Sequence, residues 1–274
     1  MFNLFSFGYI PQGHFWQDLC GRVCGVPNLF KRLQSRVAMK LIDPKETEKI
    51  LDFGCGAGFF GFECAKRGSF VTGADLHENL KQSYSFGIGH FQYVKLIADQ
   101  KLPFESHSFD KIIMSEIFVV LNDPLVTLQE LQRVLKTTGT LVVLNTLGRL
   151  NIQKAFKQHN WILNFLRKRL KFFPNSYEDY TENFLKTDGV NLFQWYSLAE
   201  LVFFLNKSGF KNIQVTFPYK SLAISIFNWI QFYRFGSQKS LAVNFSLPLY
   251  LVLELANLFS RRRDDSNVVI IAKP

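Results

Sequence analysis

The sequence predicts an α/β fold, with a mostly parallel sheet of seven strands flanked by helices. From residue 49 onward, short apolar segments alternate with stretches of helical periodicity, as in a parallel sheet covered on both faces. The first of these segments runs into a loop with three alternating glycines, which suits the start of a helix after a strand. Further along, Ser197 and Glu200 form a capping box that opens another helix.

The elements follow in order along the chain. Strands are predicted at residues 50–53, 70–74, 93–97, 111–114, 140–144, 212–217 and 268–272. Helices are predicted in residues 15–43 with a break at Pro27, and near 58–67, 78–85, 124–136 and 197–208. The segment Lys136-Thr137-Thr138-Gly139 is expected to stop one helix and lead tightly into the fifth strand.

The chain, residues 1–274, is expected to form a single domain. Residues 1–43 are predicted to be an N-terminal helical lid. Two stretches, 148–195 and 218–265, do not fit the alternation and are rich in apolar and basic residues. We expect them to be insertions before and after the sixth strand that form a helical cap at one edge of the sheet.

Composition excludes a disordered or low-complexity chain, because 47% of the residues are hydrophobic. The 32 Lys and Arg against 22 Asp and Glu leave a net charge of +10, which favours an anionic partner: nucleic acid, a membrane surface or a charged substrate. The four cysteines show no metal-ligand spacing, so free thiols and no metal site are predicted. No apolar run reaches the ~18 residues of a membrane span, and Met1–Gly13 lacks the features of a signal peptide. These features predict a cytoplasmic protein that at most lies on the inner face of a membrane.

The chemistry is concentrated where three successive predicted strands end. The first strand ends at Asp52 and Phe53, followed by Gly54-Cys55-Gly56-Ala57-Gly58, whose glycines allow a sharp turn and close approach of a ligand. The second ends at Asp75, where a carboxylate can bind both hydroxyls of a ribose. The third leads to Asp99, which could accept a hydrogen bond from an adenine amino group. Together these residues indicate a nucleoside-containing ligand.

A nicotinamide or flavin enzyme is the rival interpretation, since Gly56-Ala57-Gly58-Phe59-Phe60-Gly61 matches G-x-G-x-x-G. The match begins two residues late, after Gly54. The helix would also start with two bulky phenylalanines where a pyrophosphate needs close approach. Both features disfavour a dinucleotide.

From about Lys40 to Thr146, the chain resembles the class I S-adenosylmethionine-dependent methyltransferases, in particular the group acting on small molecules and lipids. Leu51–Gly58 resembles their cofactor loop and Val71–Leu76 their ribose strand, while Ala98–Phe104 with Ser108–Ile113 resembles the adenine strand and the approach to the fourth strand. The resemblance implies a Rossmann-like fold and S-adenosylmethionine as cofactor. It implies cofactor binding by Asp52, Gly54, Cys55, Gly56, Gly58, Asp75, Leu76, Asp99, Gln100 and Ser115.

Individual roles follow from the same resemblance. The glycines would lie under the methionine portion, Asp75 would hold the ribose with Leu76 against the adenine, and Ser115 would lie near the methionine portion. Asp52 would either fix the loop backbone or contact the cofactor, and both alternatives stay open.

The general base is not identified by the sequence. Many relatives carry paired histidines after the fourth strand, where this chain has Val119 and Val120. Ser115-Glu116-Ile117-Phe118 also differs from the loop of enzymes that methylate exocyclic amino groups. His14, in the predicted lid, is a weak candidate for the base.

The composition of the two insertions gives a clue to the kind of molecule that accepts the methyl group. Residues 149–171 carry seven positive charges and no carboxylate along an amphipathic helical pattern, and Arg261-Arg262-Arg263 follows short apolar runs in the second insertion. This pattern suits contact with an anionic membrane, and it equally suits a plain helical cap on the sheet. Methylation of a small lipophilic or lipid-linked acceptor, with O-methylation favoured, is therefore the predicted function. Alternatives are a nucleic-acid methyltransferase, which the charge would also explain, and a cofactor-binding protein without catalysis.

Overall fold

The computed structural model describes residues 37–56, 58–76, 90–97, 101–147, 194–219, 255 and 267–274. The seven strands are β1 (Lys49–Phe53), β2 (Phe70–Asp75), β3 (Phe91–Lys95), β4 (Phe109–Ser115), β5 (Leu135–Thr146), β6 (Lys211–Thr216) and β7 (Asn267–Lys273). The helices are α3 (Phe59–Ala65), α5 (Pro124–Val134) and α9 (Leu198–Lys207), with a short 3-10 helix η1 (Phe118–Val120) and a further helical segment at residues 37–42.

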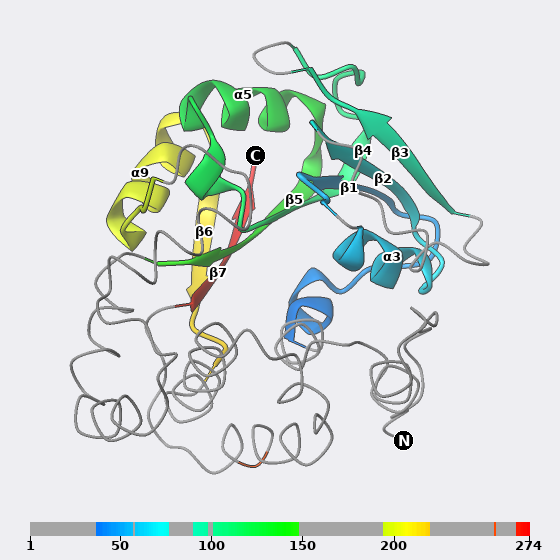
Figure 1. Ribbon diagram of the computed structural model, residues 1–274, viewed down its shortest axis with the longest axis horizontal. Coiled ribbons are helices and arrows are strands. Elements are labelled where there is room, and N and C mark those ends of the chain that lie inside the picture. The colour runs from blue at the N-terminus through cyan, green and yellow to red at the C-terminus, as the bar shows by residue number, and fades with distance from the viewer. Residues whose placement is uncertain are drawn as a thin grey trace, which may run out of the picture.

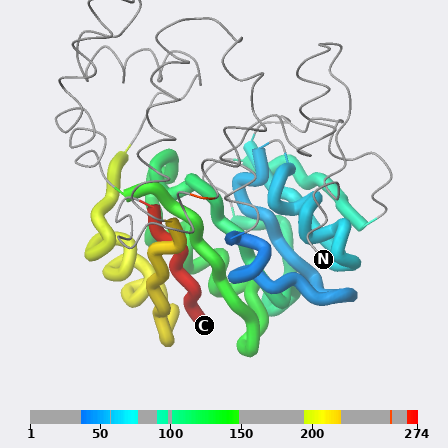
Figure 2. Tube along the Cα trace, turned by 90° about the horizontal axis from the view of Figure 1, so that it is seen from below, coloured from blue at the N-terminus to red at the C-terminus, as the bar shows by residue number. Residues whose placement is uncertain are grey.

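The strands form one sheet in the order β3-β2-β1-β4-β5-β7-β6. Strands β1 to β5 pair in parallel, whereas β7 is antiparallel to both β5 and β6. Figure 2 shows β7 lying between β5 and β6, although β6 precedes it in the chain. The predicted mostly parallel seven-stranded sheet is confirmed.

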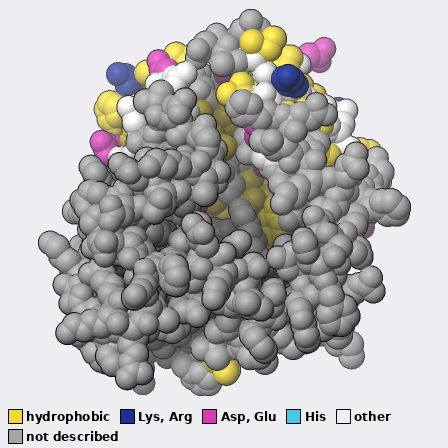
Figure 3. Space-filling view, in the orientation of Figure 1, with side chains coloured by type: hydrophobic (Ala, Val, Ile, Leu, Met, Phe, Trp, Pro, Cys, Tyr) yellow, Lys and Arg dark blue, Asp and Glu magenta, His cyan; other side chains and the backbone are white. Residues whose placement is uncertain are grey.

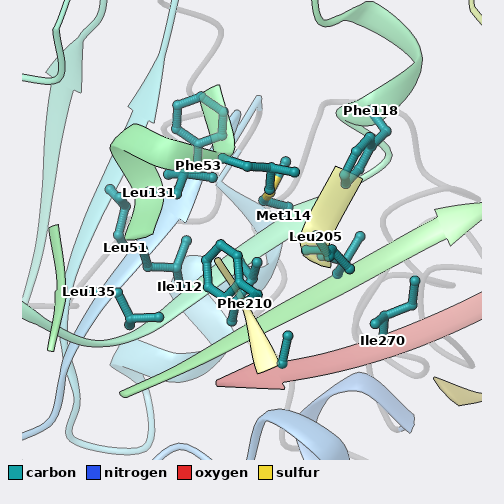
Figure 4. Packing of buried hydrophobic residues seen from close by; sticks show 14 of the residues in the cluster. Leu51, Phe53, Ile112, Met114, Phe118, Leu131, Leu135, Leu205, Phe210 and Ile270 are labelled. Carbon is teal, nitrogen blue, oxygen red and sulfur yellow. The ribbon is translucent and has the colours of Figure 1, made fainter. Parts of the chain in front are cut away.

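Helices cover both faces of the sheet (Figure 1). On one face, α5 and α9 pack on a hydrophobic core that includes Leu51, Met114, Leu131 and Leu205 (Figure 4). On the other, α3 and residues 37–42 pack on a second core that includes Ile50. Strands β1, β2, β4 and β5 each contribute side chains to both cores, so they are held between two apolar layers in which parallel strands are stable.

Local signals explain where the helices begin. The Asp123 side chain caps α5 by accepting hydrogen bonds from the backbone N–H groups of Leu125 and Val126, and Pro124 occupies its first turn. The predicted capping box of α9 is present, with Ser197 and Glu200 bonded reciprocally. Helix α3 has no side-chain cap; the residue before it, Gly58, has a φ of 82°, which suits glycine.

Several predicted boundaries are wrong by a few residues. Helix α5 ends at Val134 rather than 136, and β5 begins at Leu135 rather than 140, so Lys136–Gly139 is strand and not a turn. The cause is tertiary: the backbone N–H groups of His107 and Ser108 bond to the carbonyls of Arg133 and Val134, which draws this backbone into the sheet early. Strand β3 is shifted two residues toward the N-terminus from its predicted place.

Other predictions concern residues outside the described part of the chain. These are the helix at 78–85, most of the lid at 1–43, and nearly all of the insertions 148–195 and 218–265. Within the described residues, no helix is long and apolar enough to cross a membrane. On the face shown in Figure 3, hydrophobic side chains of the described residues are visible near the centre, and charged ones lie mainly toward the upper rim.

Candidate functional site

The candidate site lies where the strand order of the sheet reverses. Strand β1 pairs with β2 on one side and with β4 on the other, so the connections that leave β1 and β4 diverge beyond their carboxyl ends. In open α/β sheets a crevice forms at such a switch point and binds ligands. The glycine loop that follows Phe53 begins at this point.

Glycine is required by the backbone of this loop. Gly54, Gly56 and Gly58 have φ values of 68°, 50° and 82°, all in the left-handed region. The loop is tied to the neighbouring strand, since the N–H groups of Gly54 and Cys55 both donate to the carbonyl of Ala74, at 2.7 and 3.2 Å.

The first and second of these glycines differ in their surroundings. A Cβ added at Gly54 would lie 2.1 Å from Cδ1 of Ile117, the second residue beyond β4. A Cβ added at Gly56 would meet no atom of the described residues within 4 Å. Gly54 therefore allows the segment after β4 to pack on the loop, whereas the described part of the chain leaves the side of Gly56 open.

Asp75 connects the end of β2 to the loop. Its Oδ2 accepts a hydrogen bond of 2.8 Å from the N–H of Gly56, and the residue is half-buried. Its carbonyl accepts from Leu96 N at 2.7 Å and from the Tyr93 hydroxyl at 3.2 Å. The carboxylate is thus fixed at the carboxyl end of the sheet, beside the open side of the loop.

Asp52 has a different environment from Asp75. It is only 2% exposed, and its Oδ2 accepts a hydrogen bond of 2.9 Å from the N–H of Gly61 in the first turn of α3. A carboxylate here satisfies a helix N-terminal donor and interacts favourably with the helix dipole. Of the two roles left open for Asp52, this geometry supports fixing the backbone rather than contacting a ligand.

Of the other predicted cofactor-binding residues, three are described by the structure and two lie outside its described part. Cys55 is buried. Burial is the main cause that raises the pKa of its thiol, and the charges of Asp52 and Asp75 add to it. The thiol therefore stays protonated. Leu76 is exposed beyond β2, and Ser115 ends β4 half-buried. Asp99 and Gln100, like the candidate base His14, lie outside the described residues.

A side-chain network that the sequence did not reveal anchors the loop after β3. Arg133 in α5 donates to the carbonyls of Leu102 and Phe104, at 3.1 and 2.8 Å, and pairs with Glu130. Glu130 in turn accepts from the N–H of Leu102 at 3.0 Å. The pair holds the chain just beyond residues 98–100, where adenine contacts are predicted.

Glu116, the first residue after β4, was also missed as a functional candidate. Its φ is +57°, which is uncommon for a residue with a long side chain. Thr146 at the end of β5 donates to its carboxylate from both the backbone N–H and the hydroxyl, at 3.0 and 2.9 Å. A signal was present in the sequence, because an acidic residue lies two positions beyond the predicted fourth strand.

A cavity of about 490 Å³ lies at the opposite end of the strands. Its lining includes Lys49, Phe70, Phe91 and Phe109, which are the first residues of β1, β2, β3 and β4. It is therefore not part of the crevice at the carboxyl ends. Among the described residues, no group of three or more His, Cys, Asp or Glu is arranged to hold a metal ion.

Comparisons with known proteins agree on one enzyme class. A family model described as a methyltransferase domain matches residues 51–143. The demethylmenaquinone methyltransferase of Tropheryma whipplei is 30% identical over 182 residues, covering 65% of this chain and 72% of that protein. The ubiquinone biosynthesis O-methyltransferase of Histophilus somni is 26% identical over 196 residues, covering 64% of this chain and 79% of that protein.

Solved structures show the same fold at lower identity. An S-adenosylmethionine-dependent methyltransferase from Mesorhizobium loti superposes with a TM-score of 0.56 at 16% identity, covering 90% of this chain and all of that one. A phosphoethanolamine N-methyltransferase from Haemonchus contortus, solved with S-adenosyl-L-methionine, also has a TM-score of 0.56 at 16% identity, covering 96% of this chain and 61% of that one.

Proposed function

The chain belongs to the class I S-adenosylmethionine-dependent methyltransferases, and on that premise we propose that it methylates a hydroxyl group of a small lipophilic or lipid-linked acceptor. S-adenosylmethionine is its cofactor. The names of the curated relatives support a small lipophilic acceptor, and we propose a hydroxylated aromatic ring carrying an apolar chain, such as a quinone precursor.

The residues at the switch point fit this cofactor. No atom of the described residues lies within 4 Å of a Cβ added at Gly56, and the Asp75 carboxylate is held beside it by the Gly56 N–H. We assign the methionine portion to the glycine loop and Ser115, the ribose to Asp75 and the adenine to Leu76. We also propose that Asp99 accepts a hydrogen bond from the adenine amino group and that Gln100 belongs to the cofactor site.

The cofactor supplies a methyl group already activated on a sulfonium, so the protein need not provide a nucleophile. Alignment of donor and acceptor can supply roughly 7–11 kcal/mol of the barrier. A base that removes the proton of a hydroxyl acceptor adds about 10²–10⁴-fold. Cys55 is a poor candidate for either role, because burial keeps its thiol protonated.

Two independent observations support a lipophilic acceptor. The curated relatives at 30% and 26% identity carry names that refer to menaquinone and ubiquinone. The insertions also combine apolar runs with seven unopposed positive charges at 149–171 and with three consecutive arginines at 261–263, which Asp264 and Asp265 follow. A surface of that composition suits the headgroup region of an anionic membrane, where such acceptors reside.

We propose that the insertions bring the enzyme to such a membrane. Each basic residue near an anionic surface contributes about 1 kcal/mol, and salt weakens this attraction. The test is sedimentation with phosphatidylglycerol-containing liposomes, comparing wild type with a variant neutralised at Arg167, Lys168, Arg169, Arg261, Arg262 and Arg263. A matched control neutralises six exposed lysines elsewhere: Lys40, Lys45, Lys95, Lys101, Lys207 and Lys211.

We expect wild type and control to sediment together, and the insertion variant to stay in solution. Equal binding by all three proteins, or no binding by wild type, would leave the insertions as a plain cap.

Activity is tested by transfer of a radiolabelled methyl group to 4-decylcatechol and to total RNA. Label in the organic extract supports the proposed acceptor class. Label in RNA, with none in the organic extract, would favour the nucleic-acid alternative that the net charge of +10 also suits.

A further inference from the structure

The cavity of about 490 Å³ at the amino ends of the strands has no role in the proposed methyl transfer. It lies at the opposite end of the sheet from the glycine loop and Asp75. Its volume falls within the range of about 300–1,000 Å³ that small-molecule sites occupy. Its lining combines aromatic rings with a small number of polar side chains, which is the usual composition of such sites. The cavity is therefore a candidate for a second binding site.

The cavity exists because a loop, and not a helix, lies over this part of the sheet. Residues 101–108, the described part of the connection from β3 to β4, contain no helix. No residue of β3 belongs to the core on which α5 and α9 pack. Helix α9 lies toward the other edge of the sheet, which β6 forms (Figure 1). Room is left between the loop and the strands, where a connecting helix would pack directly.

The floor of the cavity is polar where β2 and β3 meet. Alternation along β2 places Phe70 and Thr72 on the same face as Ala74, which belongs to the core under α5. The amide Nε2 of Gln92 in β3 donates a hydrogen bond of 2.8 Å to the Thr72 hydroxyl. Thr72 is buried, so this bond holds the Gln92 amide against the floor.

The wall that the loop forms is fixed by hydrogen bonds. Arg133 donates to the carbonyl of Phe104 at 2.8 Å, and the Phe104 ring stands edge-on to the Phe109 ring with the centroids 5.2 Å apart. The Ser108 hydroxyl donates to the carbonyl of Glu105 at 2.9 Å, which closes the turn between them. An aromatic wall that is ordered before binding loses little conformational entropy when a ligand arrives.

Phe70 offers an aromatic surface to the cavity that the fold does not use. Its side chain is 46% exposed, although it belongs to the first residue of a strand in the interior of the sheet. Its ring meets the His90 ring edge-on, with the centroids 4.8 Å apart. A planar aromatic ligand would bury this surface and gain the favourable ring-to-ring contacts that aromatic pairs make.

The ionisable groups of the cavity favour an anion. The backbone N–H of Lys49 donates to Oδ2 of Asp110 at 2.9 Å, while the Asp110 carboxylate pairs with Lys136 at 2.7 Å. The Lys49 ammonium itself has no ion pair or hydrogen bond among the described residues. His90 can also carry a positive charge, whereas Glu105 is the one carboxylate among the lining residues. Together with the net charge of +10, this balance favours a negative group beside Lys49.

We propose that this cavity is a second ligand site, separate from the methyl-transfer crevice, and that it binds a small planar aromatic carboxylate. The ring of the ligand lies between Phe70 and the loop wall at Phe104, and its carboxylate accepts a hydrogen bond from the Lys49 ammonium. Binding alone defines the site, so the proposal is independent of the identity of the methyl acceptor.

The probe is 1-naphthoate, and its binding to the full chain is measured by calorimetry. Two compounds with the same ring serve as comparisons: 1-naphthylmethanol, which is neutral, and 1-naphthylmethylamine, which is positively charged. We expect 1-naphthoate to bind about tenfold or more tightly than either, because hydrogen bonds to charged groups are the stronger ones. Saturating S-adenosylhomocysteine should leave its affinity unchanged, because the two sites lie at opposite ends of the strands.

Three variants test the residues that are assigned to the site. Lys49→Met keeps the apolar stem and the backbone N–H, so it should fold normally and weaken 1-naphthoate binding about tenfold or more. Phe70→Ala should weaken it roughly 2–10-fold. Lys211→Met, at the exposed first residue of β6 on the far edge of the sheet, is the matched control and should bind like wild type. All three should keep the affinity of wild type for S-adenosylhomocysteine.

The contrary results are equally specific. Absence of 1-naphthoate binding to wild type, or equal binding by Lys49→Met, would refute the site. Displacement of 1-naphthoate by S-adenosylhomocysteine would place the probe in the crevice. Equal binding of the alcohol would refute charge recognition by Lys49, and tighter binding of the amine would assign that recognition to Glu105. None of these measurements follows methyl transfer, so the proposed function stands or fails separately.

Discussion

The glycine loop makes a prediction that separates folding from ligand binding. Gly54 and Gly56 have similar left-handed φ values, 68° and 50°, so alanine costs a similar backbone strain at either position. Their surroundings differ, because a Cβ at Gly54 would lie 2.1 Å from Ile117, whereas one at Gly56 would meet no atom within 4 Å among the residues that the structure describes. Gly54→Ala should therefore damage the fold, and Gly56→Ala should damage cofactor binding.

The magnitudes follow from these two environments. A left-handed alanine costs about 1–2 kcal/mol at each position. At Gly54 the clash adds an overpacking cost of about 1–3 kcal/mol, because Ile117 packs against the core and must move. The difference between the two variants isolates the clash, and at roughly 2–4 °C per kcal/mol it corresponds to about 2–12 °C in Tm. Gly56→Ala should lose at least tenfold in affinity for S-adenosylhomocysteine, about 1.4 kcal/mol.

Thermal melts and calorimetry measure the two effects, and a third variant tests the cause. Ile117→Ala removes the atoms that clash with the new methyl group, so Gly54→Ala combined with Ile117→Ala should be less destabilised than the sum of the single changes. Additive losses would refute the clash. Normal cofactor affinity in Gly56→Ala would refute the assignment of the open side of the loop to the ligand.

Three further outcomes are expected. Asp75→Asn should weaken S-adenosylhomocysteine binding by about 1.5–3 kcal/mol for each ribose bond to a charged acceptor, measured by calorimetry, while largely keeping Tm because the amide oxygen can still accept from Gly56. The hydrogen bond with Arg133 is the main reason that the pKa of Glu130 is lowered. The ionised Glu130 carboxylate therefore stabilises the folded protein above the ordinary glutamate pKa of about 4.3, and this contribution is lost as the pH falls. The Tm gap between wild type and Glu130→Gln should therefore narrow progressively as melts are recorded at pH values further below about 4.3. Ser197→Ala should cost about 1 kcal/mol in chemical denaturation by removing the cap of α9, and an unchanged midpoint would refute that role.

Sequence patterns predicted those features that depend on neighbours along the chain. The strand positions, the glycine loop and the Ser197 cap are encoded in local periodicity and turn chemistry, and all three are present in the structure. The early start of β5 depends instead on residues 107–109, which lie far away in the sequence. A local pattern cannot report that pairing.

The site shows the same division. Asp75 stands out in the sequence because it ends a strand, whereas only the burial of Asp52 and its bond to Gly61 favour a backbone role for Asp52 over contact with a ligand. The orientation of the Glu116 carboxylate could not be predicted, because Thr146, which donates both hydrogen bonds to it, lies 30 positions away in the sequence. Residue type and spacing predict which residues gather at the carboxyl end of the sheet, whereas the contacts that hold them follow only from the structure.

The position of β7 constrains the order in which this protein is assembled during synthesis. Strand β6 leaves the ribosome before β7, yet it joins the sheet only through β7. Strands β1 to β5 can pair as they emerge, while β6 must wait for residues 267–273. Until then the edge of β5 is open to pairing with another chain, which is a route to aggregation. A premature stop before residue 267 would leave that edge exposed permanently, so such truncated chains should be degraded or insoluble rather than partly active.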